Sequence, residues 1–164
     1  MASLNVPVPG RVERVAADLE PRLTPFEAVR DRHTLVAKRF ETEDVHALEA
    51  DLRPRLADVR PFEVAVTGVD YFETPTTGRS PVVYLVVESP GLRRLHEMLA
   101  EEFGPIPGLE GDDYVPHVTL ARGGRVDDAD RLADASVDPV SWTASALHVW
   151  SGRYRETVSR IALR

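Results

Sequence analysis

The sequence predicts an α+β fold with two similar lobes, each an antiparallel sheet with helices on its outer face, and a cleft between them. The expected elements run strand, helix, strand, helix, strand, and this order then repeats. A Pro-Gly pair ends a strand ahead of a helix twice, at 9–10 and 90–91, and Thr-Leu follows in the next strand at 34–35 and 119–120. We therefore expect one domain over residues 1–164, built from approximate repeats 1–80 and 81–164.

In the first half, alternating apolar residues predict strands, and apolar residues at helical spacing predict helices. In chain order these are a strand at 2–8, a helix at 11–20, a short strand at 33–37, a helix at 43–59 and a long strand at 61–73. Pro54 should perturb the second helix, because proline lacks a backbone N–H. Turn residues at 74–80 end this half.

The second half begins with a nearly continuous apolar strand at 81–89, which should lie centrally in a sheet. The elements expected after it are a helix at 91–103, a loop at 104–113, a strand at 115–122, a short acidic helix at 126–135 and a hairpin of 139–154 with 156–164. His96 follows the inward-facing Leu95, so we expect it at the boundary or surface of its helix. The Gly- and Asp-containing segment 108–113 is a candidate mobile lip of the cleft.

Composition excludes several functional classes. The chain has 164 residues, a formal net charge of −7 and no cysteine, so it has no thiolate nucleophile and no cysteine-bound metal. No apolar run reaches the roughly 20 residues that cross a bilayer, and the first residues lack a signal-peptide pattern, so we expect a cytoplasmic protein without membrane contact. The acidic balance argues against broad duplex binding, but 19 arginines against one lysine allow a local phosphate site.

Pro116-His117-Val118-Thr119-Leu120 is the clearest candidate motif for chemistry. In a strand, residues two apart share a face, so His117 and Thr119 point the same way. Histidine transfers protons near neutral pH, and threonine can donate a hydrogen bond to a phosphate oxygen. The motif therefore indicates a phosphate-handling site.

The chain resembles the two-histidine phosphoesterase superfamily, which contains the RNA 2′,3′-cyclic phosphodiesterases also called 2′-5′ RNA ligases. The matching segments are PHVTLAR (116–122) as the second H-x-T motif, VVYLVVESPGLRRLHEML (82–99) as its preceding strand and helix, and FEVAVTGVDYF (62–72) as the strand closing the first lobe. The resemblance implies two H-x-T motifs facing across a cleft, with one histidine as general base, the other as general acid, and the threonines holding the phosphate. It implies no metal and no organic cofactor.

The first motif departs from that pattern. Aligning Thr34-Leu35 with Thr119-Leu120 puts Arg32 at the first catalytic position and turns His33 to the opposite face. Three interpretations follow, and we favour the first. Either Arg32, Thr34, His117 and Thr119 form a site with one proton-transfer group, or a β-bulge brings His33 into the cleft, or Tyr154 or His148 replaces the missing imidazole.

We therefore expect a phosphodiesterase-like hydrolase that acts on RNA 2′,3′-cyclic phosphate ends or on small cyclic or 2′-5′-linked nucleotides. The catalytic candidates are His117, Thr119, Thr34 and His33, and the substrate-binding candidates are Arg32, Arg122 and Tyr154. Trp142, Trp150, Tyr71 and Phe72 are candidates for base stacking, although Phe72 and Trp142 are more typical of a core. The alternatives are a non-catalytic module that binds nucleotides or RNA ends and a structural domain without a phosphate ligand. We expect a monomer.

Overall fold

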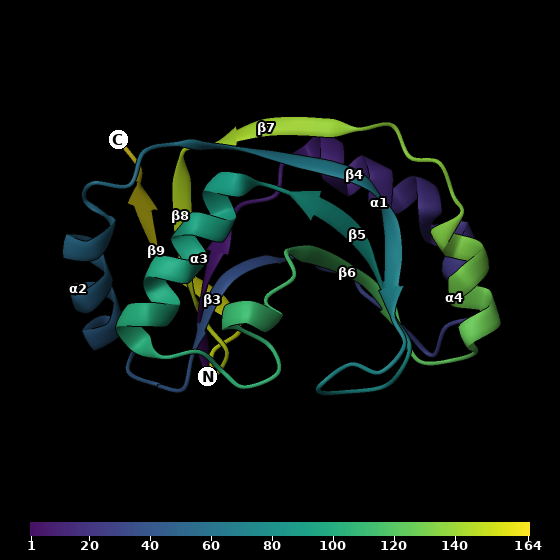
Figure 1. The fold of residues 1–164 in the computed structure, drawn as a ribbon, viewed down its shortest axis with the longest axis horizontal. Coiled ribbons are helices and arrows are strands. Elements are labelled where there is room, and N and C mark those ends of the chain that lie inside the picture. The colour runs from purple at the N-terminus through teal and green to yellow at the C-terminus, as the bar shows by residue number, and fades with distance from the viewer.

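The computed structural model describes residues 1–164 and contains one curled antiparallel sheet (Figure 1). Its nine strands are β1 (Ala2–Val6), β2 (Ala28–Val29), β3 (Leu35–Phe40), β4 (Phe62–Phe72), β5 (Val82–Glu88), β6 (His117–Arg122), β7 (Val140–Ala144), β8 (Ala146–Ser151) and β9 (Glu156–Ala162). Their order across the sheet is β7-β4-β5-β6-β3-β1-β8-β9, with β2 paired to β6. The predicted α+β class and antiparallel sheet are confirmed.

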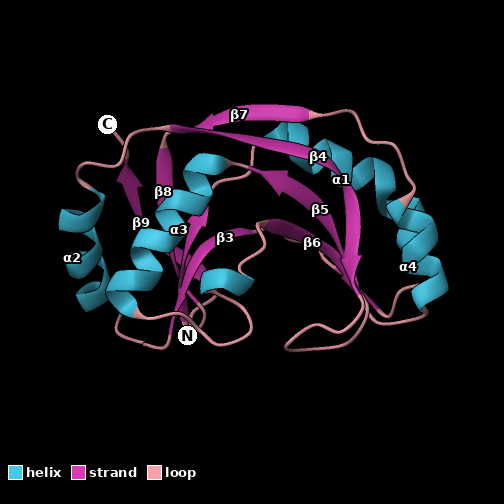
Figure 2. Ribbon diagram, in the orientation of Figure 1, coloured by secondary structure: helices cyan, strands magenta, loops and turns pink.

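Four α-helices flank the sheet, and Figure 2 shows two of them at each end of the molecule. They are α1 (Gly10–Leu19), α2 (Val45–Leu56), α3 (Pro90–Phe103) and α4 (Val126–Ala133), joined by the 3₁₀ helices η1 (Glu20–Leu23) and η2 (Gly111–Asp113). Asp44 and Ser89 cap α2 and α3 by accepting hydrogen bonds from backbone N–H groups, as short polar residues do at helix starts. Pro54 lies within the last turn of α2. None of these helices combines the length and apolar character needed to span a bilayer.

The strand order is symmetric about the contact between β3 and β6. Three strands follow outward from this contact on each side. Counted from the contact, β1 corresponds to β5, β8 to β4 and β9 to β7. The pairing registers agree residue by residue. The matching pairs are Ser3–Arg39 with Val82–Arg122, Asn5–Val36 with Tyr84–Thr119, and Val6–Leu35 with Leu85–Val118. Both sides also carry an irregularity at the same place, between Leu4 and Asn5 and between Val83 and Tyr84. The molecule therefore has a pseudo-twofold axis at the β3–β6 contact.

The two halves of the sheet are not the two halves of the sequence. Strand β4 pairs with β5 and β7, whereas β8 and β9 extend the sheet from β1. The expectation that 62–72 closes the first lobe is therefore wrong. The reason is local, because β4 and β5 follow each other along the chain, and consecutive strands usually lie side by side in a sheet.

Two further expectations need correction. Residues 139–154 do not form one strand, because the chain breaks at Ser145 into β7 and β8, which pair at opposite ends of the sheet. No glycine or proline marks that break. His96 is not at the surface but 1% exposed, with Nδ1 2.7 Å from the carbonyl of Ala37, while Gly111 N–H donates to Nε2 at 2.9 Å. The Ala37 carbonyl can only accept and the Gly111 N–H can only donate, so Nδ1 carries the one ring proton and His96 is neutral.

A buried ion pair fixes the loop between α3 and β6. Glu110, 3% exposed, accepts from Lys38 Nζ at 2.6 Å, from Arg39 N–H at 2.8 Å and from Ile106 N–H at 3.0 Å. Tyr114 stacks on His96 with ring centroids 3.7 Å apart. The segment 108–113, expected as a mobile lip, is therefore anchored to β3 at its centre.

Replacing Lys38 should strongly destabilise the fold. Lys38→Met leaves the Glu110 carboxylate buried without its counter-ion, and we expect the free energy of unfolding to fall by about 3–5 kcal/mol. Urea unfolding followed by circular dichroism measures this change. The matched control is Arg53→Met, which breaks the exposed Arg53–Glu49 pair and should cost under about 1 kcal/mol. Similar small losses in both variants would contradict the anchoring role.

Candidate functional site

A cavity of about 900 Å³ lies over the contact of β3 and β6. Strands β1, β3, β4, β5, β6 and β8 all contribute side chains to it, and the loops near 74–77 and 108–115 supply further walls. The pseudo-twofold axis passes through this region, so each lobe provides one half of the lining. The predicted cleft between lobes corresponds to this cavity.

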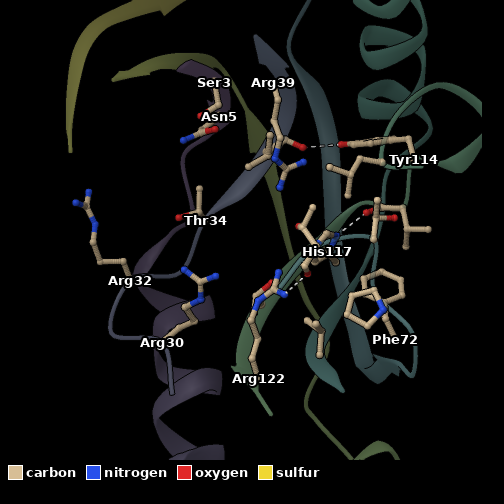
Figure 3. A pocket seen from close by; sticks show the side chains of 18 of the residues that line it. Ser3, Asn5, Arg30, Arg32, Thr34, Arg39, Phe72, Tyr114, His117 and Arg122 are labelled. Atoms are coloured by element: carbon tan, nitrogen blue, oxygen red, sulfur yellow. Dashed lines mark hydrogen bonds between the residues drawn. The ribbon is translucent and has the colours of Figure 1, made fainter. Parts of the chain in front are cut away.

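His117 lies at the start of β6 and lines the cavity (Figure 3). Its Nδ1 is 2.7 Å from the carbonyl oxygen of Val115. The carbonyl can only accept, so Nδ1 carries a proton, and in the neutral ring Nε2 keeps its lone pair. The rings of Phe72 and Tyr84 contact the imidazole edge-on, with centroids 5.2 and 5.3 Å away. The structure thus holds His117 in one tautomer, with Nε2 available as a base.

The surroundings of His117 favour its neutral form. Burial lowers the pKa of His117 below its ordinary value, and the positive charges of Arg39 and Arg122 lower that pKa further. The hydrogen bond to Val115 acts in the opposite direction but does not outweigh burial. At neutral pH the imidazole is therefore unprotonated, as a general base must be before it takes a proton.

Five arginines line the cavity of this acidic protein: Arg30, Arg32, Arg39, Arg122 and Arg155. Only two carboxylates, Asp31 and Asp113, share that lining. The guanidinium of Arg122 donates from Nη1 to Thr77 O at 2.8 Å, while its buried Nε has no partner. Burial lowers the pKa of Arg122, and Arg30 and Arg39 lower it further. An anion bound here would compensate these crowded positive charges.

The pseudo-twofold axis relates the two motifs by an offset of 83 residues, since Leu35 matches Val118 and Arg39 matches Arg122. Thr34 therefore occupies the position related to His117, and Val36 the position related to Thr119. The sequence alignment of Thr34 with Thr119 differs from this register, because it made Arg32 the equivalent of His117. In the register of this structure, the first motif is Thr-Leu-Val and contains no imidazole.

The structure brings five of the predicted site residues to the cavity: His117, Thr119, Thr34, Arg32 and Arg122. It does not bring His33 there, because the His33 ring points to helix α1 and lies 2.5 Å from Glu13 Oε2. Tyr154 is 61% exposed and outside the cavity, and His148 is also absent from its lining. No bulge turns His33 into the cavity, and neither Tyr154 nor His148 lies where it could replace a second imidazole.

The Arg32 guanidinium lies over an aromatic ring. Its guanidinium carbon is 4.1 Å from the ring centre of Trp150, and Nη1 donates to Arg155 O at 3.4 Å. Trp150 and Phe72, both in the lining, are related by the pseudo-twofold axis, because they face Ser3 and Val82 across paired strands. Phe72 therefore contributes to the site, whereas sequence reasoning placed it more readily in a core.

Sequence reasoning missed several lining residues: Ser3, Asn5, Arg30, Arg39 and Tyr114. A signal for Arg39 exists, because it lies in β3 where Arg122 lies in β6, but it emerges only when the repeats are offset by 83 residues. No group of histidine and carboxylate side chains is arranged to hold a metal ion.

Comparisons with known proteins agree with this fold. A family model described as the 2′-5′ RNA ligase superfamily matches residues 33–155. A protein of Thermus thermophilus has a TM-score of 0.65 and 21% identity, covering 99% of this chain and 97% of its own. A protein described as a phosphoesterase has a TM-score of 0.62, 19% identity and coverages of 99% and 97%. Escherichia coli LigT, complexed with 3′-AMP, has a TM-score of 0.62, 18% identity and coverages of 99% and 96%. The search of curated proteins found no match.

His117 should titrate at an unusually low pH. Because burial and neighbouring arginines disfavour the imidazolium, we expect its midpoint below the ordinary 6.5. Its Cε1–H resonance in an NMR titration, assigned with His117→Gln, measures that midpoint directly. Protonation is then less favourable in the folded than in the unfolded chain, so stability from this group is full above pH 6.5 and declines as pH falls toward the lowered pKa. A midpoint at or above 6.5 would contradict the described environment.

Proposed function

Since the chain belongs to the 2′-5′ RNA ligase superfamily, we propose that it is a phosphodiesterase-like hydrolase with a single proton-transfer group, His117. Its substrate is a 2′,3′-cyclic phosphate at an RNA end, or a small cyclic or 2′-5′-linked nucleotide. The observation that carries this proposal is a neutral imidazole with a free Nε2 in a cavity lined by five arginines. A base beside concentrated positive charge suits attack on a phosphodiester.

Each residue of the cavity has its own role in the proposed hydrolysis. His117 Nε2 removes a proton from water as the water oxygen attacks phosphorus, and the bond from phosphorus to the leaving ester oxygen breaks. Thr119 donates a hydrogen bond to a non-bridging oxygen, and Arg122 and Arg39 neutralise the charge that builds there. Arg32 is held on Trp150 and supports the bound nucleotide.

The leaving oxygen receives no proton from a second imidazole. Thr34 occupies the related position, and its hydroxyl can donate a hydrogen bond but is too weak an acid to give up its proton near neutral pH. The leaving oxygen therefore takes its proton from solvent. A positioned acid is typically worth ~10²–10⁴ in rate, so this site supports slow rather than absent turnover.

The second candidate is a non-catalytic module that binds a nucleotide or RNA end. Thr34 and Val36 favour the binding module, because they occupy the positions related to His117 and Thr119, where the other H-x-T motif would have its histidine and threonine. Escherichia coli LigT, of similar fold, is complexed with 3′-AMP, and this supports a nucleotide as the ligand of either candidate. A cytoplasmic location and a monomeric state stay predictions.

Hydrolysis of adenosine 2′,3′-cyclic phosphate, followed by chromatography of the product, tests the proposal. His117→Ala should lower kcat/KM by about 10²-fold or more, because it removes the only base. His33→Ala is the matched control and should leave the rate unchanged, since that ring contacts Glu13 outside the cavity. Thr119→Val should lower the rate by a smaller factor, as it removes one hydrogen bond to phosphate.

Three results decide between the candidates. Turnover that disappears in His117→Ala establishes the hydrolase. Binding of the nucleotide without turnover in the wild type establishes the binding module. Neither binding nor turnover would contradict both.

A further inference from the structure

The cavity carries more positive charge than one cyclic phosphate can balance. Its five arginines and two aspartates leave a formal surplus of three positive charges with His117 neutral, although the whole chain carries −7. A nucleoside 2′,3′-cyclic phosphate brings one negative charge, and each phosphodiester that joins a further nucleotide to it brings one more. The surplus therefore fits an anion with more than one phosphate.

Two of these arginines lie apart from the proposed base. The charges of Arg39 and Arg122 lower the pKa of His117, so both lie near its ring. Arg32 lies away from these three residues in Figure 3, and its Nη1 donates to the carbonyl oxygen of Arg155 at 3.4 Å. Arg32 and Arg155 are both exposed, and neither forms an ion pair with a carboxylate. Their guanidinium groups are accessible to an anionic group other than the reacting phosphate.

Arg155 is held in a backbone conformation that disfavours arginine. It is the only residue other than glycine with a positive φ, which is 56° and lies in the left-handed region. Arg155 ends the turn at 152–155 that joins β8 to β9. Glycine or asparagine would suit this position better, so the turn itself gives no reason for an arginine. The position in the cavity lining does give one.

The same turn presents an aromatic ring to solvent. Tyr154 is 61% exposed and is the only aromatic residue among the exposed large hydrophobic residues. Its backbone N–H donates to Ser151 Oγ at 3.2 Å, and the guanidinium carbon of Arg153 lies 5.4 Å from its ring centre. Exposed aromatic rings beside basic residues bind single-stranded nucleic acid, because the rings stack on bases while the basic groups neutralise the backbone. The turn has both features at the rim of the cavity.

We propose that Arg32 and Arg155 form a second phosphate subsite, which takes the phosphodiester one nucleotide upstream of the reacting phosphate. The preceding base stacks on Tyr154, outside the cavity. The assignment rests on the proposed function, because it takes the reacting phosphate to bind beside His117. The preferred substrate is then the end of an RNA strand and not a single nucleotide.

Calorimetric titration with three ligands tests this subsite. The probes are adenosine 3′-phosphate, the dinucleotide ApAp with a 3′-phosphate, and the same dinucleotide with an uncharged methylphosphonate linkage. We expect the wild type to bind ApAp roughly 10- to 100-fold more tightly than the uncharged dinucleotide, because only the charged linkage engages the arginines. The uncharged dinucleotide should bind about 5-fold or more tightly than adenosine 3′-phosphate, because it adds a base that stacks.

Variants separate the two contributions. In Arg32→Met combined with Arg155→Asn, the charged and uncharged dinucleotides should bind within about 2-fold of each other. Asparagine suits the left-handed backbone, and thermal unfolding verifies that the variant is folded. Tyr154→Leu should abolish the gain from the added base and preserve the gain from the charged linkage. The matched control is Arg94→Asn, which removes an exposed charge on α3 outside the cavity and should change no affinity.

The outcomes distinguish the subsite from the proposed function. Equal wild-type affinity for the charged and uncharged dinucleotides, with adenosine 3′-phosphate bound, would overturn the subsite and leave the proposed function intact. A charged-linkage gain that survives in the double variant would also overturn the subsite. Unchanged binding of both dinucleotides to Tyr154→Leu would overturn the role of Tyr154. Failure of all three ligands to bind would overturn the subsite and the proposed function together.

Discussion

The whole site depends on how β3 meets β6. The two strands join through one backbone position, Leu35 opposite Val118, and this contact carries the pseudo-twofold axis of the sheet. Matching irregularities in the β1–β3 and β5–β6 ladders keep the same register on both sides. Because strand side chains alternate between faces, that register decides which residues from each lobe enter the shared cavity. It makes Thr34 the symmetry-related counterpart of His117, and Arg39 that of Arg122.

The cavity that results is symmetric in backbone and asymmetric in chemistry. One half holds a neutral histidine, oriented by Val115 and flanked by two aromatic rings. The other half holds a hydroxyl, a single buried amide and an arginine whose guanidinium carbon lies 4.1 Å from the ring centre of Trp150. The buried Lys38–Glu110 pair ties β3 to the loop that leads to Val115, the residue that orients His117.

Sequence patterns predicted the fold class and the face of β6 that lines the cavity. They assigned Arg32 instead of Thr34 as the residue related to His117 by the pseudo-twofold axis. The alignment through Thr34 and Thr119 uses an offset of 85 residues, while the strand register uses 83. A slip of two residues keeps every side chain on the same face, so alternation cannot detect it. Arg32 and Thr34 therefore line the cavity as predicted, but their counterparts across the axis differ. The burial of His96 depends on Ala37 and Gly111, contacts that no local pattern records.

The register can be tested by restoring the motif that it assigns. Thr34→His combined with Val36→Thr places an imidazole and a hydroxyl at the positions related to His117 and Thr119, and Arg32→His places an imidazole at the position from the sequence alignment. Hydrolysis of adenosine 2′,3′-cyclic phosphate is the measurement. We predict that the double variant raises kcat/KM by about 10²-fold or more, the typical value of a positioned acid, while Arg32→His gives no gain. A gain in Arg32→His without one in the double variant would contradict the register and the single-imidazole site built on it.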